Sequence, residues 1–165
     1  MTKRKRRPNL FKSVLRFFAF LIILADILVP VAVIVPQLGG YVSFAVVSAS
    51  MAPAIPVGSM VYVSYAEPET IQPGEVITFY MNVEADTTTT HRVVENHAQK
   101  KVFVTKGDAN EKVDIVPIPY RSVLGRVVFT IPVLGFILMG INLVYGKIMY
   151  VASFVMAVVL LALTR

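Results

Sequence analysis

Four side chains that could together perform acyl-transfer chemistry occur in chain order at the ends of segments that resemble strands. Ser50 comes first, His91 opens a later apolar run, and Asp108 and Asp114 follow. A serine hydroxyl, an imidazole that accepts its proton and a carboxylate that orients the imidazole are the parts of a serine hydrolase site. An imidazole is largely neutral at pH 7 and can act as the base. Because such groups meet only in the folded chain, their spacing leaves open which aspartate orients His91.

The stretch 48–58 is the part of the chain around which we expect the site to be organised. Ser48 and Ser50 stand two residues apart at the end of the apolar, alternating run 41–47, and a proline-rich turn follows them. A serine held at a strand end against a stiff turn presents its hydroxyl on a rigid edge. Taken alone, these residues also fit an ordinary polar strand end, so the prediction depends on the rest of the chain.

Residues suited to metal or thiol chemistry are few. His97, the second of two histidines, lies in the hydrophilic turn 95–99 and is expected to be solvated. His91 and His97 do not supply the three or four ligands that zinc requires. The chain has no cysteine, which excludes disulfides, thiol catalysis and cysteine-based zinc sites. We therefore expect no metal and no cofactor. For Asp108, the alternative to a functional role is a turn capped by its own side chain.

Short alternating or β-branched runs between residues 41 and 129 predict a mainly β domain. Turn residues separate the runs, and no stretch in this region has a convincing helical period. The expected strands are 42–48, 60–65, 75–81, 92–95, 101–105 and 124–130. Together they predict a small, partly closed, barrel-like sheet of about 90 residues.

The positive charge of the chain is concentrated at its beginning. Seven of the sixteen lysines and arginines lie in the first sixteen positions, where there is no acid: Lys3, Arg4, Lys5, Arg6, Arg7, Lys12 and Arg16. A nucleic-acid-binding domain would spread its bases over a folded face. A basic cluster that precedes an apolar run instead holds that end of the chain in the cytoplasm. We read the charge as a topology signal and expect no nucleic acid as a partner.

Two apolar segments near the ends predict membrane-spanning helices. Residues 17–35 contain one charge, Asp26, and residues 148–163 contain none. Each is close to the length that a bilayer requires. A cleavable signal peptide is the main alternative for the first segment, although its apolar run is longer than a normal signal core. We assign Asp26 no role, and expect it either to lie on a face that packs on a partner span or to be neutral.

Residues 127–143 are apolar but contain Pro132, Gly135 and Gly140, which make a poor straight helix. We therefore expect a segment on the membrane surface here, with a third span as the alternative. The predicted organisation is a basic cytoplasmic N-terminus (1–16), a transmembrane anchor (17–36), an extracytoplasmic β domain (37–130), a membrane-surface segment (131–146) and a C-terminal transmembrane helix (147–165). The chain is thus predicted to be a multi-pass cell-membrane protein with both termini inside.

Several of these stretches resemble type I signal peptidases. Residues 48–58 resemble the family's nucleophile box, Ser-Gly-Ser-Met-x-Pro-Thr-Ile, and residues 72–79 resemble its Gly-Asp-Val-Ile strand. Residues 91–94 and 105–110 resemble the later boxes. The common bacterial branch has a lysine where this chain has His91, so the chain resembles the endoplasmic-reticulum-type branch, which is also found in archaea and some Gram-positive bacteria. Residues 125–127 and 131–135 fit that branch too.

The resemblance implies a role for each candidate residue. Ser50 matches the nucleophile, His91 the general base, Asp114 the charge-relay acid and Asp108 a second required acid. Ser48 matches the residue whose hydroxyl joins the Ser50 backbone N–H in binding the oxyanion. The chain departs from the pattern at three places beside the nucleophile, Ala49, Ala52 and Ala54, which stand for glycine, glutamate and threonine. None of these changes removes a reacting group.

The function implied by the resemblance is that of a membrane-bound serine endopeptidase that removes signal peptides from exported preproteins. Its partners would be signal peptides with small residues near the cleavage site and the lipid bilayer, with the secretion translocon as a further candidate. The main alternative is a catalytically silent membrane subunit that binds preproteins or partner proteins. The intact set of Ser50, His91, Asp108 and Asp114 favours the enzyme. A self-cleaving Ser-Lys repressor peptidase has a related β fold but would need a DNA-binding domain in place of the anchor.

Overall fold

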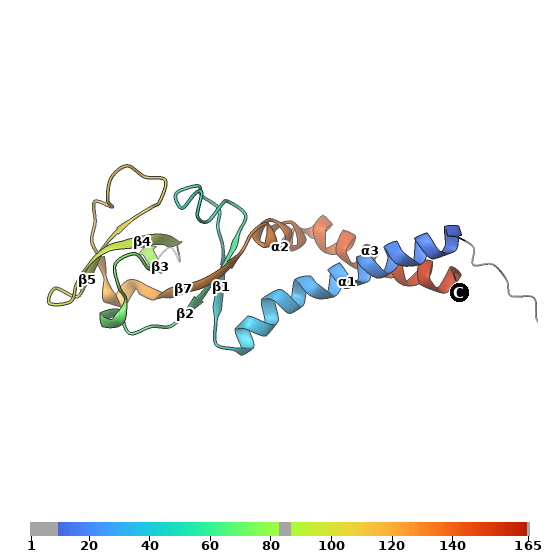
Figure 1. Cartoon of the computed structure of the whole chain (residues 1–165), viewed down its shortest axis with the longest axis horizontal. Coiled ribbons are helices and arrows are strands. Elements are labelled where there is room, and N and C mark those ends of the chain that lie inside the picture. The colour runs from blue at the N-terminus through green and yellow to red at the C-terminus, as the bar shows by residue number, and fades with distance from the viewer. Residues whose placement is uncertain (1–9, 83–86, 165) are drawn as a thin grey trace, which may run out of the picture. The chain divides into compact units, whose positions relative to one another are not determined.

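The computed structural model describes residues 10–82 and 87–164, so Lys3, Arg4, Lys5, Arg6 and Arg7 of the basic cluster lie outside the described residues (Figure 1). The described chain forms two compact units. One contains the described residues before 35 and after 139, and the other contains residues 35–139. The first unit is helical and the second is built on a β-sheet, as the sequence predicts.

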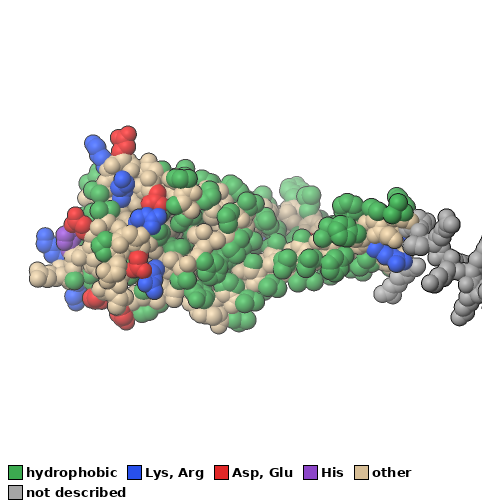
Figure 2. Space-filling model, viewed as in Figure 1, with side chains coloured by type: hydrophobic (Ala, Val, Ile, Leu, Met, Phe, Trp, Pro, Cys, Tyr) green, Lys and Arg blue, Asp and Glu red, His purple; other side chains and the backbone are tan. Residues whose placement is uncertain are grey.

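Two apolar helices make up most of the first unit. Helix α1 (Leu10–Leu38) has 29 residues and α3 (Val144–Leu163) has 20, and both are long and apolar enough to cross a bilayer. Hydrophobic side chains cover them almost continuously in Figure 2. The described part of helix α1 begins at Leu10, seven residues before the expected span. It ends where Gly40 adopts a φ of +82° and donates a hydrogen bond to the Gln37 carbonyl.

The two helices of this unit lie side by side and are joined by polar groups (Figure 1). The Ser153 hydroxyl on α3 is 3.2 Å from each carboxylate oxygen of Asp26 on α1. The Tyr150 hydroxyl donates to the backbone carbonyl of Asp26. Asp26 therefore lies on the face of α1 that meets α3, which is the first of the two alternatives expected for it.

The second unit contains one open, seven-stranded antiparallel sheet in the order β1-β2-β7-β3-β4-β5-β6. The predicted mainly β fold with an apolar helix at each end is thereby confirmed. The strands are β1 (Val42–Ala45), β2 (Met60–Ser64), β3 (Val76–Asn82), β4 (Thr87–His97), β5 (Val102–Lys106), β6 (Ile118–Pro119) and β7 (Val123–Ile131). Short 3-10 helices, η1 (Pro68–Thr70) and η2 (Tyr120–Ser122), precede β3 and β7. Charged side chains are scattered over this unit (Figure 2).

Some strand boundaries differ from those expected. Strand β1 ends at Ala45, three residues early, although the Val46 N–H still donates to the Ser59 carbonyl and the Val46 carbonyl accepts from the Gly58 N–H. Strand β4 starts five residues early, because the threonines at 87–90 are β-branched and extend the pairing with β3. The edge strand β6 was not expected, since a two-residue strand that contains a proline leaves no periodic pattern.

Two clusters of buried side chains stabilise the sheet. The larger contains Ile71, Ile77, Phe79, Val93, Phe103, Ile118 and Tyr120. The second contains Val61 and Val63 from β2 together with Met51 and Ile55 from the turn after Ser50. The turn that follows Ser50 is thus packed into the core through Met51 and Ile55.

A short helix, α2 (Leu134–Asn142), follows β7 where a membrane-surface segment was expected. Its nine residues are too few to span a bilayer. The start of α2 packs on the end of the serine turn, since the Phe136 N–H donates to the Gly58 carbonyl and a Cβ on Gly58 would lie 2.0 Å from the Phe136 ring. Gly58 also has a φ of +81°, so both its conformation and its neighbour require glycine there.

Candidate active site

The turn that carries Ser50 is held by its own backbone and by two buried side chains. The Ala52 N–H donates to the Ala49 carbonyl at 3.0 Å, and the Ile55 N–H donates to the Met51 carbonyl at 2.8 Å. Met51 and Ile55 are only 2% and 5% exposed, so they fix the turn in the core. Ser50 lies between these anchors and β1, with its side chain partly exposed.

The hydroxyls of Ser48 and Ser50 lie 3.3 Å apart. This is the hydrogen bond that the structure gives to the Ser50 hydroxyl, and the structure gives it none to His91. The two predicted serines therefore point to the same place, one partly exposed and one exposed. Such hydrogen bonds at hydrolase sites often tighten only when a substrate is bound.

His91 is buried on β4, with 7% of its surface exposed, and its ring is fixed by a carboxylate. Its Nδ1 lies 2.6 Å from Oδ2 of Asp114. The hydroxyl of Thr105 donates to the same carboxylate oxygen at 2.6 Å, and the Asp114 N–H donates to the Thr105 carbonyl at 2.8 Å. The ring of Phe79 meets the imidazole edge to face, with centroids 6.3 Å apart. With Nδ1 bound to the carboxylate, Nε2 is the nitrogen left to exchange a proton with another group.

Asp108 does not contact the histidine but binds its neighbour, Arg92. The Arg92 Nε and Nη2 donate to the two carboxylate oxygens of Asp108 at 2.8 and 2.7 Å, and Nη1 donates to the Gly74 carbonyl at 2.7 Å. The hydrogen bonds that Arg92 donates to Asp108 raise the pKa of the Arg92 guanidinium, burial opposes that rise, and the negative charge of the Asp108 carboxylate adds to it. The Asp108 carboxylate is thus held at both oxygens by the Arg92 guanidinium.

The loop that carries Asp108 also contacts the serine turn. The Ala109 N–H donates to the Ser50 carbonyl at 2.8 Å, and the Asn110 N–H closes the loop on the Gly107 carbonyl at 3.0 Å. A Cβ added to Gly107 would lie 2.7 Å from the Ser50 carbonyl oxygen, so only glycine allows this approach. The Arg92–Asp108 pair thus connects the strand of His91 to the backbone of Ser50.

A third ion pair fixes the turn before β3. The Glu75 carboxylate accepts from Arg126 Nη1 at 2.7 Å and from the Gln72 N–H at 2.7 Å. Burial acts to raise the pKa of Glu75, but the hydrogen bond from Gln72 and then those from Arg126 outweigh it and lower the pKa below its usual value. The same turn supplies the Gly74 carbonyl to Arg92, so it also helps to hold the Arg92 side chain.

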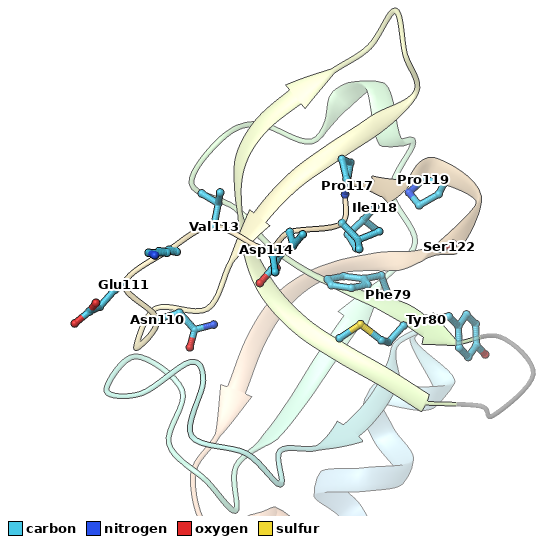
Figure 3. A pocket seen from close by; sticks show the side chains of 14 residues that line it. Phe79, Tyr80, Asn110, Glu111, Val113, Asp114, Pro117, Ile118, Pro119 and Ser122 are labelled. Atoms are coloured by element: carbon cyan, nitrogen blue, oxygen red, sulfur yellow. The ribbon is translucent and has the colours of Figure 1, made fainter.

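Two cavities border these residues. A small one of about 80 Å³ lies beside Ser50 and is lined by residues 44–48, 50 and 51 and by the threonines at 88–90. A larger one of about 910 Å³ opens between the end of β3 and the segment 110–119 (Figure 3). Asp114 and Phe79 both face this larger cavity in Figure 3.

Arg92, Thr105 and Gly107 belong to the site but were not singled out from the sequence. Arg92 follows His91 in the strand, and adjacent strand residues point to opposite faces of the sheet. The sequence therefore does not indicate which residue the Arg92 side chain contacts. Thr105 pairs with Val93 across the sheet, so only the strand register brings it near Asp114. His97 lies at the end of β4 with its side chain 42% exposed, and its Nε2 lies 2.9 Å from a Glu95 carboxylate oxygen.

Comparison with known proteins finds two similar proteins that have names. No model of a protein family matches the chain. It is 35% identical over 91 residues to signal peptidase I W of Bacillus subtilis, covering 53% of this chain and 47% of that protein. It is 30% identical over 112 residues to the signal peptidase complex catalytic subunit SEC11 of Ogataea parapolymorpha, covering 56% of this chain and 62% of that protein. The chain thus spans about half the length of the curated relatives it matches. Both relatives are named signal peptidases, so the predicted resemblance to the type I signal peptidase family is confirmed.

Proposed function

We propose that this chain is a membrane-bound serine endopeptidase that removes signal peptides from exported preproteins. The observation that carries the proposal is the short Nδ1–Asp114 bond of a buried histidine in the unit that also presents the Ser50 hydroxyl. The names of the two relatives support an enzyme of this class. The intact reacting groups favour activity over a silent subunit.

The proposed chemistry begins at Ser50. As its Oγ attacks the scissile carbonyl, its proton passes to Nε2 of His91, and Asp114 stabilises the imidazolium through Nδ1. The oxyanion is bound by the Ser50 N–H and the Ser48 hydroxyl, which already lies 3.3 Å from Oγ. His91 then returns the proton to the leaving amine, and the signal peptide stays on Ser50 as an ester.

Deacylation repeats these steps with water as the nucleophile. His91 takes a proton from water, the hydroxide adds to the ester carbonyl, and Oγ leaves with that proton. Asp108 acts indirectly in this scheme. It holds Arg92 and the loop 107–110, and through that loop the Ser50 carbonyl, in place.

The proposed substrate segment is extended and carries small side chains. Strand β1 lies at an edge of the sheet, with β2 on one side only, so it and the residues that follow as far as Ser48 offer backbone groups to an added strand. The cavity beside Ser50 holds only about 80 Å³, which suits a small side chain such as alanine. Phe44 and the threonines at 88–90 form its walls.

Membrane placement follows from the helices and the charge. With α1 and α3 as spans, the basic cluster stays in the cytoplasm and the β unit lies outside, where signal peptides emerge. The partners are the signal peptide, the bilayer and, as a further proposal, the secretion translocon. The SEC11 relative is named as the catalytic subunit of a complex. Additional subunits are therefore a further proposal for this chain.

The test uses the full chain in lipid with a preprotein whose signal ends in Ala-x-Ala. We expect the wild type to cleave after the second alanine, the Ser50→Ala variant to lose cleavage, and a Ser64→Ala control to cleave normally. Mass spectrometry of the new N-terminus identifies the bond. Equal cleavage by the wild type and the Ser50→Ala variant would show that Ser50 is not the nucleophile. No cleavage by wild type, with an unchanged biological effect of Ser50→Ala in cells, would favour the silent subunit.

A further inference from the structure

The larger cavity has no role in the chemistry described so far. It measures about 910 Å³, a size that suits several side chains of a bound peptide. Its walls are mainly apolar and include Phe79, Met81, Ile115, Val116, Ile118 and Pro119. Three of these side chains are highly exposed: Ile115 at 98%, Val116 at 70% and Met81 at 63%. Clustered exposed apolar side chains around a hollow indicate a binding surface.

The cavity borders the histidine pair on the side of Asp114. Asp114 lines it, and the Asp114 carboxylate, which is 22% exposed, is the group that binds His91 Nδ1 at 2.6 Å. Phe79 also lines it and packs edge to face on the imidazole. Figure 3 shows Phe79, Asp114 and Ile118 gathered at the gap between β3 and the segment 110–119. A ligand in this cavity therefore lies next to the groups that hold the base.

The chemistry of peptide cleavage places one half of the substrate on this side. The acyl half stays on Ser50, beside the small cavity lined by Phe44 and the threonines at 88–90. The leaving amine must receive its proton from His91, so the residues that follow the scissile bond leave past the imidazole. The two cavities have no lining residue in common, which fits separate sites for the two halves of one peptide.

We propose that the larger cavity binds apolar side chains of the first residues that follow the scissile bond, which become the start of the mature exported protein. This inference rests on the proposed function. In this proposal, the segment 113–119 selects the first residues of the released mature protein. The small cavity selects the signal-peptide residue that precedes the scissile bond. Substrates with apolar residues soon after the cleavage site should bind more tightly than substrates with charged residues there.

The experiment compares two preproteins that are identical up to Ala-x-Ala. One has Leu and Val at the second to fourth positions after the cut, and the other has Asp and Ser there. We expect kcat/KM to be about tenfold higher for the apolar preprotein, mainly through a lower KM. The Ile115→Asp variant should reduce that ratio to near one, whereas the control Val128→Asp, an exposed valine outside both cavities, should keep it. Because Ile115 is 98% exposed, its replacement should not prevent folding.

A binding measurement separates this inference from the proposed function. The Ser50→Ala chain in lipid nanodiscs is titrated with a fluorescent peptide that spans the cleavage site and carries the apolar residues. Binding that weakens about tenfold with added Ile115→Asp, but not with Val128→Asp, supports the cavity even if no preprotein is cleaved. Equal binding and equal kcat/KM for apolar and polar peptides would overturn it. A ratio unchanged by Ile115→Asp would overturn it as well, and would point to lipid or a partner protein on this surface.

Discussion

Arg92 and Asp108 form a two-point ion pair, with Nε–Oδ1 at 2.8 Å and Nη2–Oδ2 at 2.7 Å, one residue away from the histidine that binds Asp114. Neighbouring residues of a strand face opposite sides of the sheet. Strand β4 therefore presents His91 to one side and Arg92 to the other, and the segment after β5 supplies a carboxylate to each. The two aspartates that the sequence could not distinguish bind different groups: Asp114 binds the His91 ring, and Asp108 binds Arg92.

Loss of this ion pair should slow cleavage without removing the reacting groups. In Asp108→Asn, one charged partner of Arg92 is lost and the loop 107–110 is free to shift against the Ser50 carbonyl. A displacement of about 1 Å at a reacting group costs about a hundredfold in rate. We expect kcat to fall by about that factor, with a smaller change in KM.

Arg92→Lys provides the matched variant, since it keeps the charge but loses the two parallel hydrogen bonds. It should show an intermediate loss of kcat. If the Asp108→Asn and Arg92→Lys variants both cleaved at the wild-type rate, the ion pair would not be needed to position Ser50 for cleavage.

Replacement of Asp114 should have a larger effect. Asp114→Asn leaves a hydrogen-bonding group beside Nδ1 but favours the wrong imidazole tautomer, a change that costs about 10⁴-fold in serine proteases with this arrangement. We expect a loss of that order in kcat, measured under single-turnover conditions. Thr105→Val removes the 2.6 Å hydrogen bond to the same oxygen and should cost about tenfold.

Thermal unfolding of these two variants serves as the control. Thr105 is fully buried. Because valine has nearly the same shape as threonine, Thr105→Val should leave the sheet folded. A fully active Asp114→Asn enzyme would show that His91 does not depend on this carboxylate.

The acid sensitivity of the fold should depend in part on Glu75. Its pKa is lowered in the folded chain, so between the usual glutamate value of about 4.3 and the lower folded value the unfolded chain binds a proton that the folded chain does not. Stability from this group is thus present above about pH 4.3 and is lost as the pH falls through the folded pKa. The effect is small, about 1 kcal/mol or less, because Arg126 is 44% exposed.

Denaturant unfolding between about pH 6 and pH 3 measures this contribution. The Glu75→Gln variant should be less stable than wild type at pH 6, and the difference should shrink toward pH 3. A difference that stays constant over this range would mean that the ionised carboxylate is not its source.

The sequence predicts the order and type of most elements better than it predicts the contacts. Alternation of apolar residues is a local property, so β2, β3, β5 and β7 are close to their expected ranges. The threonines that begin β4 look polar in sequence, although their branched side chains suit a strand. Contacts such as Thr105–Asp114 and Ala109–Ser50 depend on strand register and loop path, which no local pattern encodes. The candidate site residues could therefore be identified from residue type and family resemblance. Which of them contact one another could be seen only in the folded structure.

The polar contact between the apolar helices gives a prediction about the membrane unit. The Ser153 hydroxyl lies 3.2 Å from both carboxylate oxygens of Asp26, so the two side chains meet between α1 and α3. The chain has no cysteine, which makes an engineered pair easy to read. The double variant Asp26→Cys, Ser153→Cys in lipid should form an intramolecular disulfide on mild oxidation, seen as a mobility shift that a reductant reverses. Asp26→Cys with Val151→Cys is the control, because Val151 is 61% exposed and adjacent helix positions face different directions. Efficient cross-linking at 153 but not at 151 would show that both helices cross the bilayer together in the observed register, whereas equal cross-linking at both positions would mean that Asp26 and Ser153 do not define their packing.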